Sequence, residues 1–459
     1  MKKILILAAV VLLALTAVAQ NEQLTSVYQP NSVSHTIIRR LTPTQSVSYF
    51  EEGGKHWFAL HDGQVGMIKV EIDSDYRVLD FKIYNDKIVV MCGTCQNESH
   101  GFVGWFKANG LMSRLITYHI QDNFSLSRNQ WFSSLQKLQV FTREDEEISC
   151  IVCIGETNDS LCGLIELSGV FPDTSGWTVK HGVSTWRNEY FDDIILTNSY
   201  VVTTGRYFSL FEGVSLRAHY KNNIFSASGP QDIVHYLPCV APDLFFSPLN
   251  RAVASPLIYD TIAIASAWKQ GPNNDPRLDY DGLLVNIVDI PTITTATTSA
   301  GCIRTLYTST PQVGSQTHLF DLCSDRGKQT LFLLSKNYIM NNYEHSILSI
   351  PIGGLTPIAC KHTFVPDYSF VSLYPFQYGD EYIAEGYKRS DDKQLVIYRK
   401  RDPVNARCAS EVADSMFDAE PIDAKMENSP LTTGTDIVTF FSLNSPLGEL
   451  ILSNRECQN

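Results

Sequence analysis

Two cysteine pairs with two-residue spacing are the first residues in this sequence whose types could do chemistry. Cys92 and Cys95, and likewise Cys150 and Cys153, have the spacing of a redox pair or of half a zinc site. Each pair lies in or at the end of an apolar, strand-like run, whereas a redox pair is expected at a helix start. The context therefore favours structural disulfides or buried thiols, with a metal or redox role as the alternative. We expect Cys153 and Cys162 to face each other across a hairpin and to form one disulfide.

A loop rich in Asn and Asp, residues 269–281, is the second candidate for chemistry. Asp275, Asp279 and Asp281 stand in this loop, and the last two alternate with Tyr280 before a glycine. This spacing is similar to part of a calcium-binding loop, but the terminal Glu of such a loop is missing. The pattern favours a solvated polar loop and no cofactor, with calcium binding as the alternative.

Sequence motifs of common enzymes are missing. The chain has no Gly-x-Ser-x-Gly elbow, no His-Glu-x-x-His and no glycine-rich phosphate loop followed by Lys. A hydrolase whose groups come from distant parts of the chain would leave no such motif. Glu212, Asp281 and Glu385 are the carboxylates that we assign to that alternative, a hydrolase or lyase acting on polysaccharide or peptide. The absences favour a protein without catalytic residues.

The first 19 residues have the pattern of a cleaved signal peptide. Lys2 and Lys3 precede an apolar run from Ile4 to Leu15, and small residues follow where a signal peptidase would cut, after Ala19. The run is shorter than the roughly 20 residues that span a bilayer, and no later segment reaches that length. We predict an exported protein, periplasmic, at the cell surface or extracellular; an N-terminal membrane anchor is the alternative.

Composition and charge restrict the class further. The 459 residues are 44% hydrophobic and 19% charged, and they include 21 Tyr and 23 Phe, which favours a folded protein rich in β-sheet. The net charge of −13 excludes a typical nucleic-acid-binding protein, which needs clustered Lys and Arg. The 11 cysteines all follow the leader, and their odd number leaves at least one thiol outside any disulfide within the chain.

One pattern recurs seven times along the chain. It consists of a turn with Asp or Asn, an apolar run, often a glycine, a polar loop and a second run of strand-like residues. The turn residues stand 53 to 65 residues apart, and they are Asp86, Asp145, Asn198, Asp260, Asp325, Asp380 and Asp436. The apolar runs lack strict alternation, as expected for strands covered on both faces. The only helical pattern that we assign is a short insertion from Ala406 to Phe417.

This repeat resembles that of β-propellers as an architecture, and it carries the signature of no named propeller family. The resemblance implies an all-β chain closed into a single propeller of seven blades, with six or eight as alternatives. We assign residues 20–48 to an N-terminal extended segment and residues 49–459 to the propeller. An N-terminal strand, Val65 to Asp73, is expected to close the last blade beside Leu450 to Leu452.

In a propeller, the loops between the second and third strands of all blades gather on one face. Aromatic and cationic residues, which dominate binding hot spots, recur in these loops. They are His100, Arg206, Tyr207, Trp268, Arg277, Tyr280, Tyr338, Tyr343, Tyr387 and Arg389. We predict that this face binds a glycan, peptide or protein; a structural component of an envelope or surface assembly is a further alternative.

Overall fold

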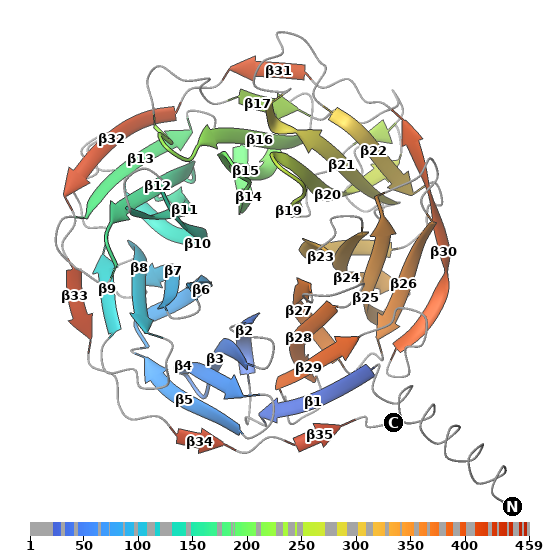
Figure 1. Cartoon of the computed structure of the whole chain (residues 1–459), viewed down its shortest axis with the longest axis horizontal. Coiled ribbons are helices and arrows are strands. Elements are labelled where there is room, and N and C mark those ends of the chain that lie inside the picture. The colour runs from blue at the N-terminus through green and yellow to red at the C-terminus, as the bar shows by residue number, and fades with distance from the viewer. Residues whose placement is uncertain are drawn as a thin grey trace, which may run out of the picture.

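The chain is all-β in the computed structural model and consists of several small antiparallel sheets (Figure 1). The structure describes residues between 22 and 456 with gaps between strands, the longest at 120–130, 271–281 and 292–301. Among the described residues, no helix is long and apolar enough to cross a membrane.

Strands that follow one another in the sequence pair in the same order. The first two sheets contain β2 (Val33–Arg40), β3 (Gln45–Glu52), β4 (Lys55–Asp62) and β5 (Gly66–Ile72), then β6 (Tyr76–Tyr84), β7 (Ile88–Cys95), β8 (His100–Lys107) and β9 (Leu115–His119). The third contains β10 (Phe132–Thr142), β11 (Ser149–Thr157), β12 (Cys162–Gly169) and β13 (Thr178–Ser184). The fourth contains β14 (Glu189–Leu196), β15 (Tyr200–Tyr207) and β16 (Gly213–Tyr220), and β17 (Ile233–Tyr236) follows it in the sequence.

The second half of the chain continues in the same way. One run contains β18 (Leu244–Phe245), β19 (Val253–Pro256), β20 (Thr261–Gln270), β21 (Gly282–Asp289) and β22 (Cys302–Thr308). The next contains β23 (Ser315–Ser324), β24 (Thr330–Ile339), β25 (Asn342–Pro351) and β26 (Ile358–Phe364). The last contains β27 (Tyr368–Pro375), β28 (Tyr382–Lys388) and β29 (Leu395–Lys400), and β1 (Glu22–Tyr28) pairs with β29. In Figure 1 the runs lie side by side around a common centre, and the innermost strands are β2, β6, β10, β14, β19, β23 and β27.

Six of the seven predicted repeats correspond to neighbouring strands of one sheet. They are the pairs β7 with β8, β11 with β12, β15 with β16, β20 with β21, β24 with β25, and β28 with β29. The prediction for the N-terminal strand is only partly right. Leu450 does pair with Ile68, but β5 is the fourth strand of the first sheet, and the strand that completes the last run is β1.

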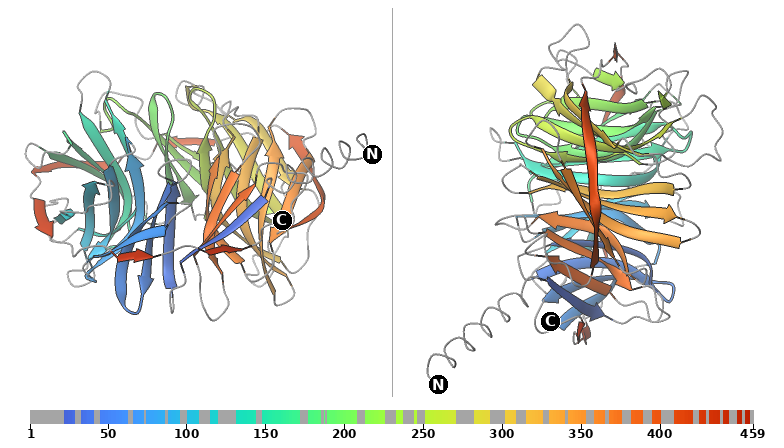
Figure 2. Two further views of the ribbon diagram at one scale, coloured as in Figure 1. Left: turned by 60° about the horizontal axis from the view of Figure 1, so that its bottom comes forward. Right: turned by 90° about the vertical axis from the view of Figure 1, so that its right-hand side faces the viewer.

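The C-terminal segment forms single strands that pair with the outer strands of the other sheets. These strands are β30 (Ala409–Glu420), β31 (Lys425–Asn428), β32 (Leu431–Ile437), β33 (Phe440–Leu443), β34 (Glu449–Ile451) and β35 (Asn454–Glu456). We call them the C-terminal belt. They pair in turn with β22 and β26, then with β17, β13, β9, β5 and β1, all antiparallel. Figures 1 and 2 show the belt passing around the outside of the sheets, against the direction of the preceding chain.

The belt corrects two predictions. Residues 406–417 were expected to be helical, but most of them belong to β30, which links β22 to β26. The seventh predicted repeat, after Asp436, supplies belt strands rather than a sheet of its own. In both cases the pairing partner lies far away in the sequence, and this tertiary pairing outweighs local propensity.

Adjacent sheets are joined by polar side chains on their innermost strands. In β6, β14 and β23 the pairing register shifts, as in a β-bulge, and an aspartate follows each shift. Its Oδ2 accepts a hydrogen bond from a backbone N–H of the next sheet. The pairs are Asp80 with Leu138 (3.2 Å), Asp193 with Ala254 (3.3 Å) and Asp321 with Leu373 (2.9 Å). In β27, Ser372 Oγ instead donates to Ile38 O at 3.1 Å, which joins the last run to the first.

In four sheets the innermost strand has a register shift, and a glycine of the second strand is the register partner at that shift. The glycines are Gly93, Gly155, Gly205 and Gly386. A Cβ on Gly205 would lie 1.7 Å from the carbonyl oxygen of Tyr190, so no side chain fits there. The recurrent glycine of the sequence pattern is therefore explained by the close approach of the innermost strand.

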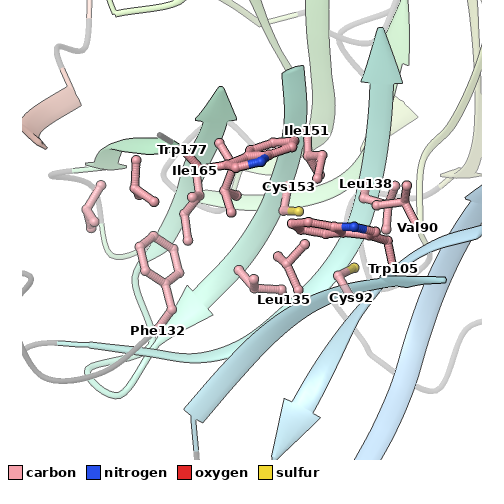
Figure 3. Packing of buried hydrophobic residues seen from close by; sticks show 14 residues of the cluster. Val90, Cys92, Trp105, Phe132, Leu135, Leu138, Ile151, Cys153, Ile165 and Trp177 are labelled. Carbon is pink, nitrogen blue, oxygen red and sulfur yellow. The ribbon is translucent and has the colours of Figure 1, made fainter. Parts of the chain in front are cut away.

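The apolar core lies between neighbouring sheets. Figure 3 shows Trp105 and Cys92 from the second sheet packed against Ile151, Cys153 and Trp177 from the third. The two indole rings lie 5.0 Å apart, and nearly every residue of β11 is buried. Both faces of the middle strands are thus covered, and this is why their apolar runs do not alternate.

Candidate functional site

The structure places two of the predicted loop-face residues in defined contacts. The His100 ring, at the start of β8, stacks on Trp131 with centroids 5.6 Å apart. Arg206 Nε donates to Asp192 Oδ2 at 2.7 Å, and its guanidinium lies 5.5 Å from the Tyr190 ring centroid. His100 is in β8 and Arg206 is in β15, and the sheet of β10–β13 lies between these strands in the chain. The His100 contact and the Arg206 contacts therefore form two separate clusters.

The other predicted loop-face residues are located only by strand or fall outside the described part of the chain. Tyr338 and Tyr343 are register partners in β24 and β25. Tyr207, Trp268 and Tyr387 stand at or near strand ends in β15, β20 and β28. Arg277, Tyr280 and Arg389, and the calcium candidates Asp275, Asp279 and Asp281, lie outside the described residues. Calcium binding there stays a prediction.

Among the described residues, the exposed large apolar side chains stand mainly at the opposite strand ends of several sheets. Val170, Tyr220, Ile258, Tyr259 and Tyr374 stand where innermost strands turn into second strands or where third strands end. Sequence analysis missed these positions because it took candidate binding residues only from the loops between second and third strands, at the other strand ends. Tyr259 is the most exposed of them, at 76%. We call Tyr220, Ile258 and Tyr259 the tyrosine patch.

Hydrogen bonds hold the turns beneath the tyrosine patch together. Asp260 Oδ1 accepts from Thr197 Oγ1 and from Ser199 N, both at 2.7 Å, and Oδ2 accepts from Ser199 Oγ at 2.9 Å. The Ser199 carbonyl accepts from the backbone N–H of Lys221 at 3.0 Å. The turn that carries Tyr259, the turn before β15 and the end of β16 are therefore linked.

Tyrosine geometry adds two features to the patch. The Tyr220 ring packs on the buried Tyr200 ring, with centroids 4.8 Å apart. Tyr259 has φ 56°, in the left-handed region that is unfavourable for a bulky residue. Asn198 N donates to Tyr259 O at 3.4 Å and contributes to holding this backbone in place. The patch is thus an aromatic surface on an ordered base.

A second group of candidate side chains lies on and beside the innermost strands. We call Arg39, Lys82, Lys137 and Arg251 the cation cluster. Arg39 Nη2 lies 2.7 Å from Asp80 Oδ1, and Arg251 Nη2 lies 3.9 Å from Asp193 Oδ1. These cations are far apart in the sequence, so only the folded arrangement brings them together.

The charges of this cluster shift each other's pKa values. Burial, followed by nearby Arg251, lowers the pKa of Lys137 to about 8, although Asp80 and Asp193 oppose the shift. Burial alone would raise the pKa of Asp80. Lys82, Arg39 and Lys137, together with the Leu138 N–H, instead hold that pKa well below its ordinary range.

Neither Cys-x-x-Cys pair forms a site of its own. Cys92 and Cys153 lie in one apolar cluster, whereas Cys95 and Cys150 lie in two others on the opposite faces of β7 and β11. In a strand, residues three apart point to opposite faces, so neither pair can hold one metal or form one disulfide. Within the described residues, no group of three or more His, Cys, Asp or Glu side chains could hold a metal ion.

The predicted disulfide between Cys153 and Cys162 is not seen. Cys153 pairs with Ile165 and Cys162 pairs with Glu156, so the two cysteines are not opposite each other across the hairpin. They also belong to different apolar clusters. Burial raises the pKa of the Cys162 thiol well above its ordinary value, which keeps it protonated.

Comparison with known proteins adds no relative from which a function could be transferred. No protein-family model matches the chain, and no curated protein matches it.

Proposed function

We propose that this chain is an exported seven-bladed β-propeller that binds a polypeptide partner without catalysis, through the tyrosine patch. The propeller assignment is supported by seven consecutive runs of strands around one centre, with β1 completing the last run. Export is supported by the leader-like pattern of residues 1–19.

The exposed tyrosine patch carries the binding proposal. Soluble proteins rarely expose a cluster of large apolar side chains without a partner, and Tyr is enriched at binding hot spots. Ile258 is 44% exposed beside Tyr259, and Asp260 links the turns beneath them. Because the base is ordered, little conformational entropy is lost when a partner binds.

A polypeptide fits the patch better than a sugar. An aromatic ring alone could stack on a sugar, but the patch also exposes the aliphatic side chain of Ile258. Aliphatic and aromatic side chains together match the apolar centre of a protein interface.

Peptide and glycan arrays test the proposal. We expect the mature chain to bind a subset of arrayed peptides and the double variant I258S/Y259S to bind them at least about tenfold more weakly, as for hot-spot residues. The control is Tyr190→Ser, which removes an exposed ring at the other strand ends and should leave binding unchanged.

Three results would overturn the proposal. The first is that I258S/Y259S binds the peptides as tightly as the parent chain. The second is that I258S/Y259S and Tyr190→Ser lose peptide affinity equally. The third is that the chain binds glycans, not peptides, and that this binding depends on Tyr259. A panel of chromogenic glycoside and peptide substrates tests the non-catalytic part, because turnover on any of them would show an enzyme.

A further inference from the structure

The cation cluster concentrates positive charge in an otherwise acidic protein. The chain has a net charge of −13, yet Arg39, Lys82, Lys137 and Arg251 lie together on or beside the innermost strands of neighbouring sheets. Cations brought together in this way repel each other and lose hydration. An anion placed among them would relieve both costs.

The carboxylates beside the cluster do not balance its charge. Asp80 and Asp193 face four cations, and Asp80 already uses both oxygens, one on Arg39 and one on the Leu138 N–H. Asp192, the next carboxylate, accepts from Arg206 at 2.7 Å. Asp192 also acts on Arg251 but is shared with Arg206, so among the described residues the four cations of the cluster exceed the nearby carboxylates by about two charges.

Two of the cations have donors to offer. Arg251 Nε is buried and has no hydrogen-bond partner among the described residues, and Arg251 Nη2 is too far from Asp193 Oδ1, at 3.9 Å, for a hydrogen bond. Within the same described residues, Lys137 Nζ makes no salt bridge within 4.0 Å, yet Lys137 keeps part of its surface accessible.

We infer that the cation cluster is a binding site for a dianionic oxyanion group of the phosphate or sulfate type. Lys137 and the free Nε of Arg251 donate to its oxygens, while Arg39 and Lys82 contribute at longer range. Guanidinium and ammonium donors are the usual protein partners of such groups. The site is separate from the tyrosine patch, and its test does not depend on the proposed function.

Calorimetric titration of the full mature chain with inorganic phosphate, at constant ionic strength, tests this inference. We expect saturable binding at one site. Lys137→Met and Arg251→Gln should each weaken it at least about tenfold, as expected for the loss of one charge-assisted hydrogen bond. Lys137→Arg keeps the charge and should bind nearly as well as the parent. The control is Lys55→Met, which removes an exposed lysine paired with Glu71 and should have no effect.

Further arms of the titration identify the ligand class. Acetate should bind much more weakly than phosphate because it carries one charge. Phenyl phosphate tests whether the bound anion is a free ion or part of a larger molecule. If phenyl phosphate binds more tightly than inorganic phosphate, the site takes a phosphate group carried by a larger molecule. If the two bind equally, the site takes the free ion. Absence of saturable phosphate binding by the parent chain, unchanged binding in both Lys137→Met and Arg251→Gln, or acetate binding as tightly as phosphate would overturn the inference.

Discussion

Asp80 illustrates how a single buried side chain connects three sheets. Its oxygens accept from Arg39 in β2 and from the Leu138 N–H in β10, while the residue itself lies in β6. The pKa of Asp80 is held below its ordinary value, so its contribution to stability is present above about pH 4, the unfolded pKa. That contribution is lost as the pH falls toward the folded-state pKa.

Replacing Asp80 with Asn should lower the free energy of unfolding by about 3 kcal/mol at pH 7, because it leaves Arg39 without its charged partner. Glu71→Gln breaks an exposed ion pair with Lys55 and should cost less than about 1 kcal/mol. Urea unfolding of both variants measures the difference. If both variants lost the same free energy of unfolding, Asp80 would not be joining the sheets through Arg39 and the Leu138 N–H.

His181 should make the protein sensitive to mild acid. Burial lowers its pKa to about 4, below the unfolded value of about 6.5, so its contribution to stability is present above pH 6.5 and lost as the pH falls toward 4. The loss is at most about 3.5 kcal/mol, since one pKa unit corresponds to about 1.4 kcal/mol. His181→Leu should flatten the dependence of the free energy of unfolding on pH in this range. A parallel curve for the variant would contradict the assignment.

At the scale of elements, the glycine opposite the register shift in four of the sheets is a steric requirement. Gly205→Ala should cost at least about 2 kcal/mol, because the new Cβ would lie 1.7 Å from the carbonyl oxygen of Tyr190 and the strands would have to separate. Gly54 has φ 78° and open space around it, so Gly54→Ala should cost only about 1 kcal/mol of backbone strain. Thermal unfolding compares the two. If Gly205→Ala lost less stability than Gly54→Ala, β14 and β15 would be able to move apart at little cost in free energy.

Strand identity was predictable where apolar residues form a continuous run. Residues such as Val89 to Met91 and Ile151 to Ile154 are buried on both faces, and the sequence indicates this directly. The first sheet was missed because β2, β3 and β4 mix apolar with polar and charged residues. A strand of the C-terminal belt has the same local pattern as a strand inside a sheet, so the sequence could not distinguish the two.

At the scale of the whole molecule, the belt covers outer strands that would otherwise expose unpaired backbone groups. Deleting residues 425–459 removes β31 to β35 and uncovers the outer edges of β17, β13, β9, β5 and β1. Exposed edges pair readily with other chains. We expect the truncated chain to unfold at a lower temperature and to self-associate as concentration rises, measured by light scattering after gel filtration. A truncated monomer of unchanged thermal stability would show that the belt is dispensable.

The candidate sites were less accessible to sequence analysis than the strands. His100 and Arg206 were predicted, and they lie in aromatic clusters, but in two separate ones. Arg39, Lys137 and Arg251 stand in no motif, and their proximity depends on which sheets become neighbours. The same holds for Tyr259 and Tyr220, which stand in two adjacent runs whose turns are linked by hydrogen bonds through Asn198 and Ser199.

The sequence alone determined that the chain is all-β and that its middle strands are buried on both faces, because strand propensity and burial are encoded in neighbouring residues. Only the tertiary structure decided which cysteines share an apolar cluster, where exposed tyrosines collect and which cations gather. These outcomes depend on register and on contacts between distant segments, and a one-residue change of register reverses the direction of every side chain in a strand.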